Sequence, residues 1–348
     1  MSKAEGIAGR AGGQAPFGGA RLAVLIPCFN EEVAIAKVLG DFRAALPAAS
    51  LYVYDNNSTD RTAEVARASG AVVRRETHQG KGNVVRRMFA DVEADIYVLV
   101  DGDATYDAQS VTAMIARLVE DRLDMVVAAR VHRDEAAYRP GHRTANRLFS
   151  AFVATVFEAA FTDILSGYRV FSRRFVKSFP VLSRGFEIET ELTVHALELE
   201  LAVAEIQTPY YARPQGSASK LSTWRDGLRI LSTIVRLYRS ERPLAFFSAI
   251  GIALAAISIG LAIPIFVTFV EQGIVPRYPT AILSTGLMLI AFLCIASGLI
   301  LDTVTRGRRE LKLLAYLGQP APGDDGHRRQ VLYGNTEGEA IARDRSHQ

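Results

Sequence analysis

Cysteine, tryptophan and unbalanced charge are all scarce in this chain. Its 348 residues include 2 cysteines and 1 tryptophan, and the formal net charge is only +3. Cys28 lies in the first apolar stretch and Cys294 in a long uncharged run, so we expect no disulfide between such different environments. The small net charge gives no reason to expect nucleic acid as a partner. Residues 1–20 lack a long apolar core, which predicts a disordered tail rather than a cleaved signal peptide.

Charged residues are also missing from two stretches in the C-terminal third. Residues 244–270 and residues 281–301 contain none. Each stretch reaches the roughly 20 apolar residues that are needed to cross a bilayer core of about 30 Å. We therefore expect two transmembrane helices, and the alternative is a helical hairpin buried in a soluble core.

Basic residues flank these two stretches unequally. The link at 271–280 has Arg277 as its only basic residue, whereas both outer flanks carry several. The outer basic residues are Arg225, Arg229, Arg236, Arg239 and Arg242 before the first stretch, and Arg306, Arg308, Arg309 and Lys312 after the second. Because cytoplasmic flanks carry the excess of Lys and Arg, we expect a multi-pass protein of the inner (cytoplasmic) membrane, with both termini in the cytoplasm. The same clusters suit anionic headgroups.

The segment 21–220 alternates short apolar strands with amphipathic helices. This alternation predicts an α/β domain with a mostly parallel sheet that helices cover. Ligands of such sheets bind at the carboxyl ends of the strands. Pro27, Asp55 and Asp101 follow or end three predicted strands, at 21–27, 51–54 and 96–100. We therefore expect three chemically distinct segments to meet in one cleft.

Two segments outside this alternation are amphipathic. Residues 146–161 are rich in apolar residues, and residues 224–238 alternate arginines with Leu, Ile and Val at helical spacing. The second belongs to a predicted juxtamembrane helix at 221–243. Such helices lie in the plane of the membrane interface, and the alternative is ordinary packing against the sheet. The polar segment 302–348 predicts a largely disordered cytoplasmic tail.

Asp101-Gly102-Asp103 is the strongest local signal, because it ends the apolar strand IYVLV. Two carboxylates one residue apart can share Mg²⁺ or Mn²⁺, which would bridge the diphosphate of a nucleotide. One such pair alone is weak evidence, since loops contain many carboxylates. A second acidic turn, DNNSTD at 55–60, also follows a strand, although Asp and Asn favour turns in any protein.

The order and approximate spacing of four motifs resemble those of family 2 glycosyltransferases with the GT-A fold, which is Rossmann-like. These motifs are Pro27 with Asn30-Glu31-Glu32, the turn at 55–60, GKGN at 80–83, and Asp101-Gly102-Asp103. The resemblance runs from about Arg21 to Pro243 and continues into the apolar stretches. It implies a GT-A catalytic domain at 21–220, followed by interfacial helices and two transmembrane helices.

Three later segments resemble the polyprenyl-phosphate glycosyltransferases, the relatives of dolichol-phosphate mannose synthase. They are SGYR at 166–169, GFEIE at 185–189 and YARPQGSASK at 211–220. This resemblance implies transfer of one sugar from a nucleotide-sugar to a polyprenyl phosphate of the undecaprenyl type, for cell-envelope glycan or lipid modification. A UDP-sugar is the favoured donor and GDP-mannose the alternative, and the sugar itself is left open.

The resemblance also implies roles for individual residues. The groups expected to border the donor are Pro27, Asn30, Glu32, Asp55, Lys81 and Asp101, and those expected to hold the metal are Asp101 and Asp103. A lipid phosphate beside a sugar diphosphate requires several cations, so Arg169, Arg213 and Lys220 are expected to bind it. Glu189 is expected either to act as a base or to orient sugar hydroxyls or this cationic cluster.

Four further residues have an open role. Thr105 stands where several relatives carry Gln beside the metal, and its oxygen is a candidate ligand. Arg139, Arg143 and Arg147 either add to the acceptor site or face solvent and headgroups. No Ser, Cys or His constellation suggests a covalent route. None is needed, because a phosphate oxygen is already deprotonated and can displace the nucleotide in line, with inversion.

Three other functions agree less well with the sequence. A processive polysaccharide synthase would carry a Q-x-x-R-W segment, but Leu221-Ser222-Thr223 precede Trp224. A catalytically inactive membrane scaffold would not need the intact pair Asp101 and Asp103. A small transporter is disfavoured because two uncharged spans offer no polar path through the membrane. Association into a homo-oligomer through the spans is left open.

Overall fold

The structure is a computed structural model and describes residues 19–132, 161–183, 185, 187–213, 235–236 and 238–320. The chain divides into two compact units, which we call the sheet unit and the hairpin unit. The sheet unit comprises Met1–Arg139, Thr162–Ser219 and Ala315–Gln348. The hairpin unit comprises Pro140–Phe161 and Lys220–Leu314.

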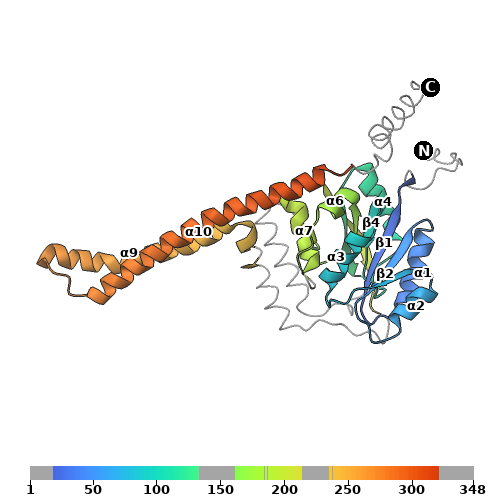
Figure 1. Cartoon of the computed structure of the whole chain (residues 1–348), viewed down its shortest axis with the longest axis horizontal. Helices are drawn as coiled ribbons and strands as arrows, with labels where there is room; N and C mark the ends of the chain where they lie inside the picture. The colour runs from blue at the N-terminus through green and yellow to red at the C-terminus, as the bar shows by residue number, and fades with distance from the viewer. Residues whose placement is uncertain are drawn as a thin grey trace, which may run out of the picture. The chain divides into compact units, whose positions relative to one another are not determined.

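Within the described residues, the sheet unit contains a seven-stranded sheet with the order β3-β2-β1-β4-β6-β5-β7 (Figure 1). The strands are β1 (Leu22–Cys28), β2 (Ser50–Asp55), β3 (Val72–Arg75), β4 (Ile96–Leu99), β5 (Met125–His132), β6 (Arg169–Ser172) and β7 (Val203–Tyr210). The pairs β1–β2, β1–β4, β2–β3 and β5–β7 are parallel, and β6 is antiparallel to β4 and β5. The mostly parallel α/β sheet predicted from the sequence is therefore confirmed.

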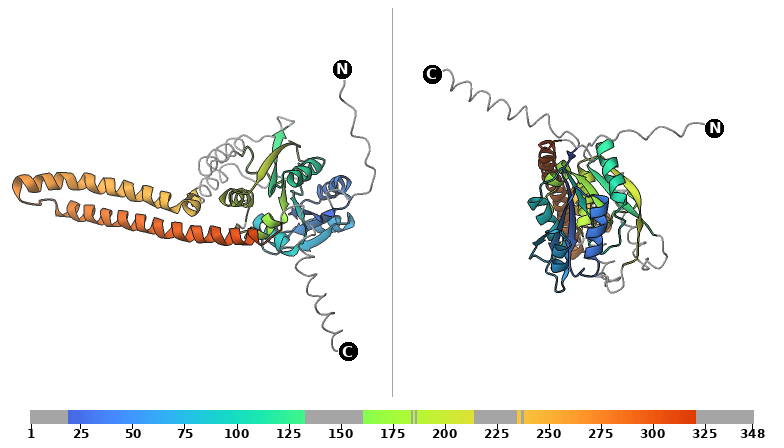
Figure 2. Two further views of the ribbon diagram at one scale, coloured as in Figure 1. Left: turned by 90° about the horizontal axis from the view of Figure 1, so that it is seen from above. Right: turned by 90° about the vertical axis from the view of Figure 1, so that its right-hand side faces the viewer.

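Helices cover both faces of this sheet, as the right-hand view in Figure 2 shows. On one face, residues of α1 (Ile35–Ala45), α2 (Thr62–Ala68) and α4 (Ser110–Glu120) join one hydrophobic core with alternate residues of β1. On the other face, Phe89 of α3 (Lys81–Asp91) contacts Tyr97 of β4 and Phe171 of β6. The described residues of the sheet unit also form α6 (Arg173–Ser178) and α7 (Ile188–Glu198).

The helix α1 illustrates why these segments fold as they do. Its buried residues are Ile35, Val38, Leu39 and Phe42. Their spacing of three and four places them on one side of a helix, which is the side that packs on the sheet. Each such side chain contributes about 1.5–3 kcal/mol when it is fully buried.

The described residues of the hairpin unit include two long apolar helices, α9 (Pro243–Gln272) and α10 (Tyr278–Leu317). Both are long and apolar enough to cross a membrane, and only 11% of each apolar window is buried. A helix in a soluble core would be mostly buried, so both are candidate membrane spans. Figure 2 shows the two helices running side by side. Ser258 Oγ donates to the carbonyl oxygen of Ser284 at 2.7 Å, and Ser284 Oγ donates back to that of Ser258 at 3.0 Å.

One boundary differs from the sequence prediction. The helix α10 continues to Leu317, so residues 302–317, which we expected at the start of a tail, are helical. This continuation follows from composition, because Leu, Ala, Lys, Arg and Glu are strong helix formers. Residues 1–18 of the tail predicted at 1–20, residues 321–348 of the tail predicted at 302–348, and most of the amphipathic segments at 146–161 and 224–238 lie outside the described residues.

Candidate functional site

The carboxyl ends of three neighbouring strands bring the predicted motifs together. The sheet register pairs Cys28 at the end of β1 with Asp55 at the end of β2. On the other side of β1, Leu25 pairs with Leu99, the last residue of β4 before the Asp101 segment. The segments after Pro27, Asp55 and Leu99 therefore lie at one edge of the sheet, as the sequence predicted.

Asp55 has one carboxylate oxygen that no described group binds. The residue is only 6% exposed. Its Oδ2 accepts the N–H of Ser58 at 3.3 Å. Its Oδ1 is buried and accepts no hydrogen bond from the part of the chain that the structure describes. A buried polar atom without a partner costs about 1–3 kcal/mol, so a ligand N–H or hydroxyl at Oδ1 would stabilise the site.

Asn30 and Glu32 bind the turn that begins at Asp55. Asn30 Oδ1 accepts the N–H of Thr59 at 2.8 Å, and Glu32 Oε2 accepts the N–H of Arg61 at 2.9 Å. Asn30 adopts a φ of 54°, a region in which asparagine is enriched. These two side chains therefore join the β1–α1 and β2–α2 connections, and their expected place beside a nucleotide stays a prediction, as does that of Pro27.

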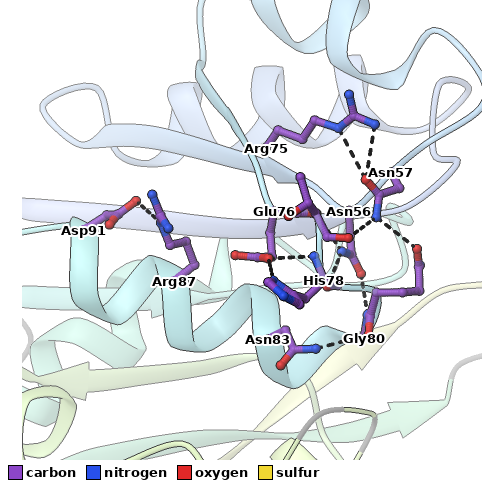
Figure 3. A network of polar contacts seen from close by, with 11 residues as sticks. Asn56, Asn57, Arg75, Glu76, His78, Gly80, Asn83, Arg87 and Asp91 are labelled. Atoms are coloured by element: carbon purple, nitrogen blue, oxygen red, sulfur yellow. Dashed lines mark hydrogen bonds and ion pairs between the residues drawn. The ribbon is translucent and has the colours of Figure 1, made fainter.

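Asn56 fixes the loop that leads from β3 to Lys81, a role that the sequence analysis missed (Figure 3). Its Nδ2 donates to the carbonyl oxygens of Glu76 and His78, both at 2.9 Å. Its Oδ1 accepts the N–H of Gly80 at 2.7 Å. Both amide hydrogens and the amide oxygen are thus used. In the sequence, Asn56 is marked only by its position directly after Asp55. Asn is common in turns of any protein, so this position does not predict its hydrogen bonds.

Lys81 joins two carboxylates from distant parts of the chain. Its Nζ lies 2.5 Å from Asp101 Oδ1 and 2.5 Å from Glu189 Oε1. The Lys81 and Glu189 side chains are 9% and 8% exposed. Burial alone would lower the pKa of Lys81, but the two carboxylates outweigh it and leave that pKa raised. The ammonium group therefore remains charged at neutral pH and balances part of the negative charge of the site.

Gly167 provides the space in which this ion pair lies. A Cβ at this position would overlap Asp101 Oδ2 and would stand 3.1 Å from Lys81 Nζ. The Gly167 N–H donates to the hydroxyl of Tyr106 at 2.9 Å, which fixes the backbone at this point. The SGYR segment therefore borders the site through its glycine.

Asp103 is buried and bound through both of its oxygens. Thr105 Oγ1 donates to Oδ1 at 2.6 Å, and Arg213 Nη2 lies 2.6 Å from Oδ2. Burial and, second, the Asp101 charge raise the pKa of the Asp103 carboxyl, whereas Arg213 and Thr105 act to lower it. Thr105 thus orients Asp103, which gives a structural role to a residue that the sequence left open.

The position of Arg213 follows from the end of β7. Tyr210 forms an antiparallel bridge with Tyr106, and the Tyr211 N–H donates to the carbonyl oxygen of Thr105 at 2.9 Å. These contacts hold the end of β7 beside the loop that follows β4, and Arg213 therefore lies next to Asp103. Two motifs that are separated by more than one hundred residues in sequence therefore share one ion pair.

Arg169 does not lie where the resemblance led us to expect it. Its exposed fraction is 0%. Its Nε donates to the carbonyl oxygen of Ser166 at 3.0 Å, and its Nη1 donates to Thr193 Oγ1 at 2.9 Å. Burial lowers its pKa to about 10, although the Glu189 charge acts in the opposite direction. We therefore correct its expected role from acceptor binding to support of the sheet, because a fully buried guanidinium is not available to a ligand.

The rest of the predicted acceptor cluster cannot be placed. Lys220, Arg139, Arg143 and Arg147 all lie outside the described residues. Of the three basic residues that we expected to bind a lipid phosphate, Arg213 is the one that the described structure brings to the aspartate pair.

The pair Asp101 and Asp103 fits a metal ion that is shared with a diphosphate. Hard carboxylate oxygens are the ligands that Mg²⁺ and Mn²⁺ prefer. Within the described ranges no group of three or more His, Cys, Asp or Glu side chains is arranged to hold a metal. A metal enclosed by protein ligands alone is therefore not indicated by these residues, whereas an ion that takes its other ligands from phosphate needs only one or two carboxylates.

The mostly parallel α/β sheet, with the aspartate pair after β4, has a GT-A-like fold. The model of glycosyl transferase family 2 matches residues 23–179. Glycosyltransferase AglJ of Haloferax volcanii is 33% identical over 293 residues, which are 82% of this chain and 94% of that protein. The chain belongs to glycosyl transferase family 2.

Two further similarities concern the donor and the acceptor of related proteins. A dolichyl-phosphate hexose transferase of Haloferax volcanii is 27% identical over 64% of this chain and 95% of that protein. The crystal structure of glucosyl-3-phosphoglycerate synthase from Mycobacterium tuberculosis with Mn²⁺, UDP-glucose and glycerol 3-phosphate superposes with a TM-score of 0.53. It is 24% identical and covers 65% of this chain and 81% of that chain, a similarity that shows the shared fold.

Proposed function

We propose that this glycosyltransferase moves one sugar from a nucleotide-sugar to the phosphate of a polyprenyl lipid at the cytoplasmic face of a membrane. The observation that carries the proposal is the ion pair of Asp103 with Arg213, since it brings a basic residue of the predicted acceptor segment to the predicted metal pair. The similarity to a dolichyl-phosphate hexose transferase supports the same acceptor class. A UDP-sugar is the favoured donor, and GDP-mannose is the alternative.

The donor would lie along the carboxyl ends of β1, β2 and β4. Asp55 Oδ1 would accept a hydrogen bond from the base or the ribose, which supplies the partner that this buried oxygen lacks among the described residues. Asp101 and Asp103 would hold Mg²⁺ or Mn²⁺, and this metal would neutralise charge on the departing nucleoside diphosphate. Lys81 is held close to Asp101 and would add a fixed positive charge beside the diphosphate.

The transfer itself needs positioning more than proton transfer. A deprotonated phosphate oxygen of the acceptor forms the new bond to the anomeric carbon while the bond from that carbon to the diphosphate oxygen breaks, and the configuration inverts. Arg213 would bind the acceptor phosphate through charge-assisted hydrogen bonds. Glu189 is paired with Lys81, which supports an orienting role more than that of a base.

The hairpin unit would anchor the enzyme where its lipid acceptor lies. The helices α9 and α10 would span the bilayer, with the basic flanks Arg242 and Arg306 on the cytoplasmic side. The exposed apolar surface of α9 and α10 supports the spans, since only 11% of each apolar window is buried.

A panel assay tests the proposed reaction. The purified full chain is incubated with Mn²⁺, a short polyprenyl phosphate and single donors from a set of UDP-sugars and GDP-mannose, and products are identified by mass spectrometry. We expect one donor to yield a polyprenyl-phosphate monosaccharide of inverted anomeric configuration. Formation of a polymer would favour the synthase alternative, and no consumption of any donor would favour an inactive scaffold.

A further inference from the structure

Tyr106 follows the aspartate pair in the loop after β4, and its ring is held from two sides. The residue is only 8% exposed. Its ring packs against those of Tyr168 and Tyr210, with centroids 5.4 Å and 5.2 Å away. Its backbone also forms the antiparallel bridge with Tyr210. The packing of the ring and the bridge therefore fix the place of the Tyr106 hydroxyl.

This hydroxyl determines where the backbone of Gly167 lies. It accepts the buried N–H of Gly167 at 2.9 Å. A Cβ on Gly167 would overlap Asp101 Oδ2, so the glycine backbone lies directly against this oxygen. The other oxygen of the same carboxylate, Oδ1, is bound by Lys81 Nζ. The Asp101 carboxylate therefore lies between Lys81 and a glycine that Tyr106 holds in place.

We propose that Tyr106 is a positioning residue for the aspartate pair: its hydroxyl holds Gly167 against Asp101 and so sets how that carboxylate faces a divalent cation. This inference rests on the proposed function, because it concerns the metal that the pair would hold, and deepens it. Asp103 is oriented separately, by the Thr105 hydroxyl at 2.6 Å. Tyr106 follows Thr105 directly, so two adjacent residues of one loop orient the two carboxylates.

Loss of the Tyr106 hydroxyl would leave the Gly167 N–H without its acceptor. A buried donor without a partner is costly, so the glycine backbone would move toward another acceptor. Such a movement changes the space beside Asp101 Oδ2, and the carboxylate could then turn away from its present orientation. Groups that orient metal ligands typically change metal affinity by about 10- to 100-fold. Tyr106→Phe keeps the packed ring and should therefore weaken metal binding without unfolding the sheet.

Two other buried tyrosines provide matched controls. The Tyr97 hydroxyl accepts the N–H of Ala94 at 3.0 Å, at the opposite end of β4 from the aspartate pair. Tyr97→Phe therefore removes the same kind of hydrogen bond away from the site. Tyr168 adjoins Gly167, and its buried hydroxyl has no hydrogen-bond partner in the part of the chain that the structure describes. Tyr168→Phe therefore removes a neighbouring hydroxyl without removing such a bond.

The first experiment measures Mn²⁺ alone, without donor or acceptor. Binding to the full chain in detergent is followed by electron paramagnetic resonance. We expect Mn²⁺ to bind about tenfold more weakly to Tyr106→Phe than to the parent protein, and equally well to the parent, Tyr97→Phe and Tyr168→Phe. Binding of Mn²⁺ to Tyr106→Phe with the affinity of the parent would overturn the proposal. Equal weakening in Tyr97→Phe would also overturn it, because the effect would then reflect a general loss of stability.

The second experiment tests the same contact without any metal. Melting temperatures are measured in EDTA for Tyr106→Phe and Asp101→Asn, singly and together. Changes at groups in one contact network do not add, whereas changes at distant groups do. We expect Tyr106→Phe to lower the melting temperature less in Asp101→Asn than in the parent, and Tyr97→Phe to lower it equally in both.

The two experiments together separate this inference from the proposed function. Additive losses for Tyr106→Phe and Asp101→Asn would overturn the positioning of Asp101 by Tyr106. If these losses are not additive and the parent protein binds no Mn²⁺, the positioning of Asp101 stands and the metal dependence of the proposed function fails.

Discussion

Lys81 Nζ lies 2.5 Å from Glu189 Oε1, and this ion pair joins the first residue of α3 to the first turn of α7. The same ammonium group binds Asp101. One buried lysine therefore fixes the position of Asp101, after β4, relative to Glu189 of α7, which lies 108 residues further along the chain than Lys81 itself. The geometry of the aspartate pair depends on this lysine.

Replacing Lys81 should destabilise the protein as well as inactivate it. In Lys81→Met the carboxylates of Asp101 and Glu189 lose their common partner while they stay close together. Breaking a buried ion pair by removal of one partner costs about 3–5 kcal/mol. Glu189→Gln should cost less, because Lys81 keeps its bond to Asp101. Thermal unfolding of both variants gives the comparison, and equal stability of Lys81→Met and the parent would show that these charges are solvated.

Gly167→Ala should slow transfer strongly without unfolding the sheet. The added Cβ would push against Asp101 and Lys81, and a displacement of about 1 Å at a reacting centre can reduce the rate roughly 100-fold. Gly40→Ala is the matched control. Nothing lies within 4 Å of a Cβ at Gly40, which belongs to α1, so that variant should keep its activity and gain slightly in stability. The comparison requires turnover and melting temperature for each, and normal turnover of Gly167→Ala would contradict it.

Asp55→Asn should weaken the binding of the nucleotide. The change removes the charge from an oxygen that is buried and has no donor among the described residues. Charge-assisted hydrogen bonds are worth about 1.5–3 kcal/mol, so the dissociation constant of UDP should rise roughly 10- to 100-fold. Calorimetric titration measures this change. The control Asp41→Asn alters an exposed carboxylate paired with Lys37 and should bind UDP normally. Equal affinity in both variants would remove Asp55 from the donor site.

The topology is tested by labelling of single cysteines in intact cells. In a background without Cys28 and Cys294, a cysteine at Gln272 should react with a membrane-impermeant maleimide from the outer face. A cysteine at Gln319 should react only after the membrane is opened. Reaction of position 319 from outside would contradict the orientation that the basic flanks predict.

The sequence was sufficient to predict which strand ends meet. It was not sufficient to predict which side chains pair across the site. Apolar strands followed by Asp55 and Asp101 predict a shared edge, because parallel strands end on the same side. The burial of Arg169 could not be predicted from strand ends. Its strand β6 is inserted antiparallel between β4 and β5, which buries the arginine that the SGYR resemblance assigned to the site. The sequence contains no local signal for such an insertion.

The long-range ion pairs could not be predicted from the sequence either. Lys81 and Glu189 were both expected near the site, but no spacing rule links residues that lie so far apart in the chain. The same holds for Asp103 and Arg213, which the end of β7 brings together. Asn56 was missed because its hydrogen bonds reach three backbone groups of another loop.

The variant Asp103→Asn tests metal-dependent transfer of one sugar to a polyprenyl phosphate most directly. Initial rates of polyprenyl-phosphate sugar formation are measured for the parent and the variant, with Mn²⁺ and after treatment with EDTA. A neutral amide cannot replace a charged oxygen ligand of a hard cation, so we expect product from the parent with Mn²⁺ and none above background in the other three conditions. Near-normal rates in Asp103→Asn, together with an active parent in EDTA, would contradict the account.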